Sequence, residues 1–362
     1  MKVAVLGAGG MAGAVISHLQ TCADVKEIVA FDIREEPVRE KEKQFGIRGT
    51  TRLDDILKDA ELPLVFITAS NAAHKELAVQ AMEAGKAVMC EKPMAVTLAD
   101  ARAMVDTSER LGAFLQIGFE CRYSQLYTTI KEWIDTGLLG QVINTHFYYI
   151  CSEFHHKGSW RNKLATGGSM FGEKLSHYVD LPRWWIGAEA SEVSTICAPN
   201  VIPYYEVRDN YYTTYRFTNG AVSQLTFMMA PGATFQGDPK QDILSQQVED
   251  GHALRYLIVG TRGAVQTDVF RRTFKRWEFG DSPECFTSTL VETLCWEEKD
   301  DQLYFHNTLD QTLDIVDRVK QGLPAKTPAR DAYETMKLCF AAELSADCGK
   351  TVQIAEIEDT QV

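Results

Sequence analysis

A glycine-rich turn near the start of the chain contains residue types that suit phosphate binding. Residues 7–12 read Gly-Ala-Gly-Gly-Met-Ala, a GxGxxA pattern between an apolar run and a segment with helical spacing. Gly7 permits a tight turn, Gly9 lets the backbone approach a pyrophosphate, and Ala12 allows close packing. The N–H groups at the start of the helix then attract the phosphate charge. The turn indicates a dinucleotide site, although an isolated match can also be a structural strand-to-helix turn.

A carboxylate follows this turn at the end of the next apolar run, where Asp32 stands. An acid there can accept hydrogen bonds from both ribose hydroxyls and would repel a 2′-phosphate, which favours NAD over NADP. Arg34 could offset such a phosphate, so NADP stays open. Asp32 could also cap the helix that comes after it.

A lysine lies in the turn Cys90-Glu91-Lys92-Pro93, directly after another apolar run. Doubly wound sheets bind their ligands at this edge, so Lys92 is expected near a nicotinamide. Burial and a cationic ring would both lower its pKa toward a range that is useful for proton transfer. Pro93 stiffens the turn and can follow a cis bond. Taken alone, such a turn is more often a solvated bend.

An acid and an imidazole follow the glycine pair at 167–168, at positions Glu173 and His177. A spacing of four places both on one face of a helix, where the carboxylate can orient the imidazole for proton exchange. Asp180 lies on a similar face and could support the pair. The simpler interpretation is an exposed Glu–His pair. Lys174 could contact substrate or be solvated.

Three further side chains are candidates for substrate binding. Arg122 could hydrogen-bond a substrate oxygen or brace a domain junction. Trp160 and Arg161 would suit the face and the hydroxyls of a sugar, or could be a core tryptophan and a surface arginine. The pair His155-His156 has no carboxylate at metal-binding spacing, so we expect loop histidines that could face substrate and no metal site.

Strands and helices alternate in the first third of the chain. This alternation predicts a parallel, doubly wound sheet with right-handed crossovers. The expected strands are 2–6, 27–31, 64–68, 87–90 and 114–118, and the expected helices are 11–19, 38–45, 72–84 and 98–111.

Strand-like segments crowd together after about residue 120. They predict an α+β domain with a large, mostly antiparallel, open sheet, in which Asn219-Gly220 forms a hairpin turn. Residues 232–250 are expected to form a loop. The predicted domains are 1–120, for the dinucleotide, and 121–362, for substrate binding and oligomerisation. The expected strands are 142–150, 192–198, 211–217, 221–229, 255–259 and 264–268, and the expected helices are 169–186, 307–321 and 330–346.

The composition is that of an ordinary globular protein, with 45% hydrophobic and 24% charged residues among 362. The net charge of −13 disfavours nucleic acid and anionic membranes as partners. Residues 3–23 lack charge, as a secretory signal does, but their glycines favour a strand, a turn and a helix. We expect no transmembrane helix. Nine cysteines without a CxxC pair indicate free thiols in a cytoplasmic protein.

The order of these motifs resembles the oxidoreductase family of glucose–fructose oxidoreductase, inositol 2-dehydrogenase and the rhizopine-catabolism protein MocA. The resemblance covers nearly the whole chain, and it is the joint order of the motifs that is specific. The matching segments are the GxGxxA turn, Asn71 and His74, 84–86 before the Glu-Lys-Pro turn, 118–119 and Arg122, 137–142, 160–161, 167–168, 177–180, 260–263 and 345–352. Many relatives have Asp where this chain has Glu173.

The resemblance implies a Rossmann domain, a second domain whose sheet forms homodimer or homotetramer contacts, and hydride transfer at a secondary hydroxyl of a sugar, inositol or polyol. Lys92 matches the family lysine, with His177 and Glu173 as further catalytic residues. The implied substrate contacts are Lys92, Arg122, Trp160, Arg161, Glu173 and His177. The implied cofactor contacts are Gly7, Ala8, Gly9, Gly10, Met11, Ala12, Asp32, Ile33, Arg34, Thr68, Ala69, Asn71, His74, Glu91 and Lys92.

Two alternatives remain open within this resemblance. Some relatives hold NAD tightly and cleave a glycosidic bond by transient oxidation and elimination, with no net redox change. Others have lost catalysis and act as dinucleotide-binding regulators. The presence of both Lys92 and His177 argues against the second alternative.

Overall fold

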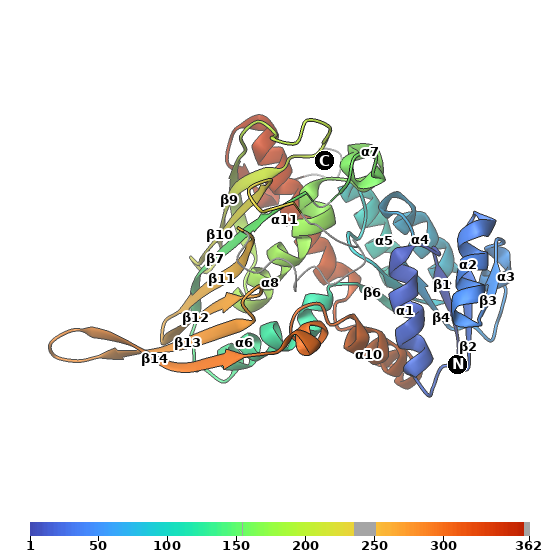
Figure 1. Ribbon diagram of the computed structural model, residues 1–362, viewed down its shortest axis with the longest axis horizontal. Helices are drawn as coiled ribbons and strands as arrows, with labels where there is room; N and C mark the ends of the chain where they lie inside the picture. The colour runs from blue at the N-terminus through green and yellow to red at the C-terminus, as the bar shows by residue number, and fades with distance from the viewer. Residues whose placement is uncertain (154, 235–250, 358–362) are drawn as a thin grey trace.

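The computed structural model describes residues 1–153, 155–234 and 251–357 (Figure 1). Most of the loop expected at 232–250 therefore lies outside the described residues. The first sheet has six parallel strands in the order β3-β2-β1-β4-β5-β6. Its strands are β1 (Lys2–Leu6), β2 (Glu27–Phe31), β3 (Arg48–Thr50), β4 (Leu64–Ile67), β5 (Ala87–Cys90) and β6 (Leu115–Ile117).

Alternate side chains of the first sheet enter cores on its two opposite faces. Val3 and Val5 of β1 pack in one core, whereas Ala4 and Leu6 pack in the other. Because both faces are covered, these strands are continuous apolar runs in the sequence. The helices of this half are α1 (Gly10–Thr21), α2 (Glu35–Phe45), α3 (Asp54–Leu57), the short turn η1 (Asn71–Ala73), α4 (His74–Glu83) and α5 (Leu98–Leu111).

The second sheet has nine strands in the order β14-β13-β12-β11-β7-β10-β9-β8-β15. Only β7 and β10 run parallel, and the other neighbours are antiparallel. Gly220, at φ +87°, closes the hairpin between β9 and β10. The strands are β7 (Val142–Cys151), β8 (Ala190–Ile196), β9 (Asn210–Phe217), β10 (Val222–Met229), β11 (Ala253–Gly260), β12 (Gly263–Asp268), β13 (Thr273–Asp281), β14 (Phe286–Cys295) and β15 (Val352–Gln353).

Helices lie on one face of this sheet, between it and the first sheet (Figure 1). Tyr178 of α8 stacks on Phe147 of β7 with ring centroids 4.2 Å apart, which fixes this helix against the sheet. The remaining elements are η2 (Glu120–Tyr123), α6 (Gln125–Asp135), η3 (Trp160–Asn162), α7 (Leu164–Gly167), the π turn η4 (Phe171–Leu175), α8 (Ser176–Ile186), η6 (Glu298–Asp300), α9 (Asp301–Tyr304), α10 (Thr308–Gln321), α11 (Ala329–Cys348) and η7 (Ile354–Glu356).

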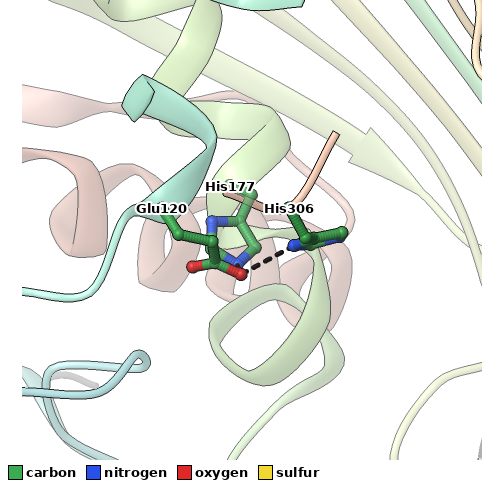
Figure 2. Close-up of side chains that lie close together, drawn as sticks. All are labelled: Glu120, His177 and His306. Carbon is green, nitrogen blue, oxygen red and sulfur yellow. Dashed lines mark hydrogen bonds and ion pairs between the residues drawn. The ribbon is translucent and has the colours of Figure 1, made fainter. Parts of the chain in front are cut away.

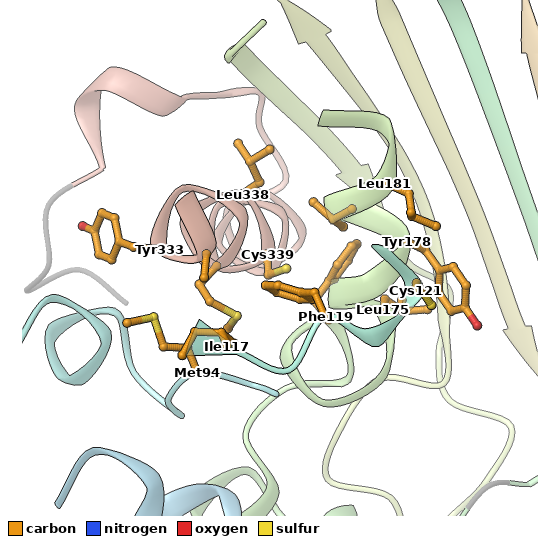
Figure 3. Packing of buried hydrophobic residues seen from close by; sticks show 14 of the residues in the cluster. Met94, Ile117, Phe119, Cys121, Leu175, Tyr178, Leu181, Tyr333, Leu338 and Cys339 are labelled. Atoms are coloured by element: carbon orange, nitrogen blue, oxygen red, sulfur yellow. The ribbon is translucent and has the colours of Figure 1, made fainter. Parts of the chain in front are cut away.

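The C-terminal helices tie the two halves together. Ile315 and Val316 of α10 enter the core that β1 and α1 share, so this helix returns to the first sheet. Figure 3 shows α11 beside the junction, where Cys339 and Leu338 belong to one core with Ile117 and Phe119. The site between the sheets therefore rests on a continuous apolar core rather than on a flexible linker.

The expected fold class is confirmed, with a parallel doubly wound sheet followed by a mostly antiparallel one. Several elements lay outside the expectations, among them α6 and the hairpin of β13 and β14. The expected helix 169–186 is divided, because the π turn η4 precedes α8. The return of α10 to the first sheet was also not foreseen.

Candidate active site

The glycine turn has the geometry that a close backbone approach needs. Gly7 has φ +102°, and a Cβ atom there would lie 2.5 Å from the Ala69 backbone. Thr68 donates its hydroxyl to the Gly7 carbonyl at 2.7 Å, which joins the turn to the end of β4. Thr68 and Ala69 therefore shape the turn that was predicted to hold the cofactor.

Asp32 stabilises the same turn from the end of β2. Its Oδ2 accepts a hydrogen bond from Ala8 N and its Oδ1 accepts one from Arg34 N, both at 3.0 Å. Each oxygen keeps a second lone pair, which leaves acceptors for ribose hydroxyls. The neighbouring Ile33 side chain is 84% exposed, as an apolar surface for an adenine would be.

The start of α1 fits a pyrophosphate. Gly9, Gly10 and Met11 are exposed, and no side chain caps the helix at Gly9. Its first N–H groups are therefore available to an anion, at the positive end of the helix dipole. The residues present thus fit a dinucleotide.

Two of the predicted cofactor contacts have other partners. His74 is fully buried, with Nδ1 at 2.8 Å from the Pro93 carbonyl, so it supports the Glu-Lys-Pro turn from within the core. A direct contact of His74 with a cofactor stays a prediction. Asn71 donates its amide to the Gly167 carbonyl at 2.8 Å, which links the first domain to α7.

Lys92 follows β5 at the carboxyl edge of the first sheet, and its bond to Pro93 is cis. Its Nζ donates to the Glu173 carbonyl oxygen at 2.7 Å, across the junction of the two halves. The structure thus brings Lys92 to the second-domain segment that was predicted to form the site. Beside it, burial and the Glu120 carboxylate raise the pKa of Glu91 to about 8.

His177 is a buried imidazole with one ring nitrogen that has no partner among the described residues. Its side chain is 1% exposed, Nε2 lies 3.3 Å from Glu120 Oε1, and Nδ1 makes no hydrogen bond. Burial lowers its pKa, the Glu120 carboxylate opposes this, and the nearby Lys92 charge lowers it further. The imidazole is therefore neutral near pH 7 and able to accept a proton.

Two polar side chains beside His177, Glu120 and His306, were not predicted from the sequence. The Oε1 atom of Glu120 lies 3.3 Å from His177 Nε2 and 2.7 Å from His306 Nδ1, as Figure 2 shows. Burial alone would raise the pKa of Glu120, but the two imidazoles hold it well below its usual range. The position of Glu120 directly after the Gly118-Phe119 motif could have identified it as a site residue, whereas no sequence feature marks His306.

Glu173 does not orient His177, contrary to expectation. Its carboxylate instead faces His155 Nε2 at 3.2 Å and Arg161 Nε at 3.5 Å. The π turn separates Glu173 from the α-helix that carries His177, so α-helical spacing does not apply across the two. Burial would raise the pKa of Glu173, but Lys92 and the two facing groups hold it well below its usual range.

Arg122 is a brace between elements, and its contact with substrate stays a prediction. Its Nε and Nη2 donate to the two Asp180 oxygens at 2.7 and 2.6 Å, and its Nη1 lies 2.7 Å from Asp331 Oδ2. This fork engages all three nitrogens of the buried guanidinium, and its partners lie in α8 and α11, so Arg122 joins elements within the second half of the chain and not the two domains. Asp180 accordingly supports Arg122 and not His177.

The aromatic and basic pair at η3 lies at the rim of the site. Trp160 is partly exposed, and the Arg161 guanidinium lies 5.1 Å from its ring centroid. Because Arg161 also faces Glu173, the pair stands where a substrate bound near Lys92 could reach it.

Burial and the charge of Lys92 lower the pKa of Lys174, which lies in the π turn.

Both halves of the chain match models of one protein family. Residues 1–119 match the oxidoreductase family with an NAD-binding Rossmann fold, and residues 127–266 match the Gfo/Idh/MocA C-terminal domain. The chain belongs to the Gfo/Idh/MocA family. Its members are oxidoreductases, and the matched first domain is an NAD-binding one.

Relatives within this family are named dehydrogenases. Inositol 2-dehydrogenase of Salmonella typhimurium is 29% identical over 363 residues, which cover 99% of this chain and 97% of that protein. Glucose-6-phosphate 3-dehydrogenase of Bacillus subtilis is 33% identical over 190 residues, 51% of this chain and 53% of that protein. A levoglucosan dehydrogenase solved with NADH and levoglucosan has the same fold, with a TM-score of 0.80, 21% identity and coverage of 99% and 100%.

Among the described residues, we find no helix that has both the length and the apolar character needed to span a membrane.

Proposed function

We propose that the protein oxidises a secondary hydroxyl of a sugar, inositol or related polyol, with NAD as the hydride acceptor and His177 as the proton acceptor. The observation that carries this proposal is the buried imidazole of His177 beside the Lys92 ammonium: its Nε2 faces Glu120 Oε1 at 3.3 Å, whereas its Nδ1 makes no hydrogen bond to any described residue. A buried nitrogen without a partner is costly unless a ligand supplies one. A substrate hydroxyl would be that partner.

Each residue has a separate role in this proposal. The glycine turn and Asp32 would hold NAD, which would supply the hydride acceptor for the substrate carbon. His177 takes the hydroxyl proton, and the Lys92 ammonium donates a hydrogen bond to the same oxygen as negative charge develops on it. The Glu173 carbonyl holds Lys92 in place through its 2.7 Å hydrogen bond. Trp160 and Arg161 at the rim suit the carbon face and the hydroxyls of a polyol.

The test is a screen of inositols, sugars, sugar phosphates and glycosides with NAD, in which NADH absorbance and released products are both followed. Lys92→Met and His177→Gln should each lower kcat by about 10²–10⁴-fold on the substrate that is found. His177→Gln should keep its affinity for NAD, measured by calorimetry, because the change does not alter the glycine turn, whereas Lys92→Met also removes an expected cofactor contact. Lys299→Met, at an exposed lysine, is the matched control.

Two results would overturn the proposal. Near-normal turnover in Lys92→Met or His177→Gln would remove these residues from the chemistry. Release of an aglycone from a glycoside without net NADH would show that oxidation is only a transient step in cleavage.

A further inference from the structure

A row of three side chains leads from the buried imidazole to the surface. The side chain of His177 is 1% exposed, that of Glu120 is 6% exposed and that of His306 is 35% exposed. One carboxylate oxygen, Glu120 Oε1, joins them, at 3.3 Å from His177 Nε2 and 2.7 Å from His306 Nδ1 (Figure 2). Only the last residue of the row meets water to any extent.

The proposed oxidation requires a path by which a proton leaves His177 for solvent. Each turnover transfers a hydride and leaves one proton on His177, which is buried and close to the positive charge of Lys92. A charged imidazole is unfavourable there, so the proton must leave before the next turnover. The charged and titratable groups that act on His177 are Lys92, Glu120 and His306, and Glu91 lies beside Glu120. Of these, only Glu120 and His306 form a continuous path away from the substrate.

We propose that Glu120 and His306 relay the proton from His177 to water. The inference rests on the proposed function, since it requires His177 to accept the hydroxyl proton. One ring nitrogen of His177 takes that proton while Nε2 passes a proton to Glu120 Oε1. The resulting Glu120 carboxylic acid donates this proton to Nδ1 of a His306 ring whose own proton is on Nε2, and Nε2 releases its proton to solvent. Exchange with water then returns the His306 ring to its starting tautomer. Each step breaks one bond to hydrogen and forms another, so a single proton is moved in total.

A metal ion at these residues is the competing interpretation. The three side chains place one carboxylate oxygen and two imidazole nitrogens within 4.8 Å of one another, which was not foreseen from the sequence. Tetrahedral ligands at 2.0–2.2 Å from zinc lie about 3.3 Å apart. The 3.3 Å between Glu120 Oε1 and His177 Nε2 equals that spacing, but the 2.7 Å between Glu120 Oε1 and His306 Nδ1 is too short for two ligands of one ion and is the length of a charge-assisted hydrogen bond. The geometry therefore favours proton transfer, and a metal becomes an outcome of the test.

The central experiment uses His306→Ala in the full chain. Its kcat should fall by up to about 10²-fold, the lower end of what a positioned proton-transfer group contributes. Added imidazole should restore turnover in a saturable way, because it can accept the proton from Glu120 directly. The KM values for NAD and polyol should stay near those of the wild type. His146→Ala, at an exposed histidine of β7, should show neither the loss nor the rescue.

Glu120→Gln tests the middle of the row. An amide cannot carry the proton, so turnover should fall without rescue by imidazole, whereas Glu120→Asp should retain part of it. Histidine NMR gives a readout that needs no substrate, since the loss of the carboxylate should move the titration of His177 to lower pH. An unchanged titration would refute the contact even if the proposed function itself failed in the substrate screen.

Two outcomes would overturn the relay while leaving the oxidation intact. One is wild-type turnover in His306→Ala with no dependence on imidazole. The other is loss of wild-type activity on chelation, with recovery on adding zinc or manganese, which would make the cluster a metal site.

Discussion

Glu91 is a buried acid whose ionisation opposes folding at neutral pH. Burial, together with the Glu120 carboxylate, raises its pKa to about 8, so the folded protein holds a proton that the unfolded chain has lost. Between about pH 4.5 and pH 8 the native state therefore binds more protons than the unfolded state, and the stability that this group contributes falls as the pH rises.

Glu91→Gln should remove this dependence, because the amide has the shape of the neutral acid and does not titrate. The free energy of unfolding of the wild type should fall by up to about 1.4 kcal/mol per pH unit more steeply than that of the variant. Urea unfolding at several pH values between 5 and 8 measures the difference. Glu298→Gln, at an exposed glutamate, is the control, and parallel curves for Glu91→Gln and the wild type would contradict the prediction.

The residue types in the sequence predicted only part of the candidate site. Lys92 and His177 could be identified because each lies in a short motif at the edge of an element. Glu173 was identified as a site residue, but His177 was the wrong partner for it. A π turn changes which way residues four positions apart face. His306 could not be found, since it meets Glu120 across 186 residues and no local pattern marks a contact of that range.

At the scale of elements, one arginine joins three segments that are distant in sequence. Arg122 of η2 forms its fork with Asp180 of α8 and an ion pair with Asp331 of α11, and Thr335 donates to Asp180 Oδ1 at 2.9 Å. Because Glu120 belongs to the same short turn as Arg122, this brace also positions the carboxylate beside His177.

Arg122→Met should destabilise the protein strongly, because it leaves the buried Asp180 carboxylate without its cation. The expected loss is about 3–5 kcal/mol in the free energy of unfolding, measured in urea at pH 7. Arg330→Met removes an exposed pair with Glu109 and should cost about 1 kcal/mol or less. Adding Asp180→Asn to Arg122→Met should recover part of the loss. Equal losses for Arg122→Met and Arg330→Met would refute the brace.

Most elements that bury one face or both were predicted well from the sequence, with helix α6 as an exception, and exposed elements were not. The bounds of β1, β2, β5 and α5 were predicted without error, because each of these elements ends directly before a glycine or a charged residue. Nearly every residue of β14 is exposed, so this strand shows no alternation that sequence could detect. Helix α6 does bury one face, and its spacing was a signal that was missed.

At the scale of the whole molecule, the large sheet has one face without helices of the described chain. Figure 1 shows α6, α8 and α11 on the side of the first domain, and the hairpin of β13 and β14 projecting beyond the body. Apolar side chains are exposed on the strands of this sheet, and they are Ile143, Tyr148, Ile196, Tyr212, Leu257, Phe286, Leu290, Val291 and Leu294. Monomers rarely expose so many apolar side chains on one sheet.

We expect a second copy of the chain to cover this face, as a homodimer or as part of a homotetramer. Tyr212 and Leu257 lie on strands β9 and β11 and are 46% and 41% exposed, so lysines there would place charge in the interface without disturbing the core. The double variant Tyr212→Lys/Leu257→Lys should have a smaller mass in solution by light scattering. Leu111→Lys, which is 41% exposed at the end of α5, should keep the wild-type mass. A monomeric wild type would refute the expectation, because the apolar face would then meet water in the free protein.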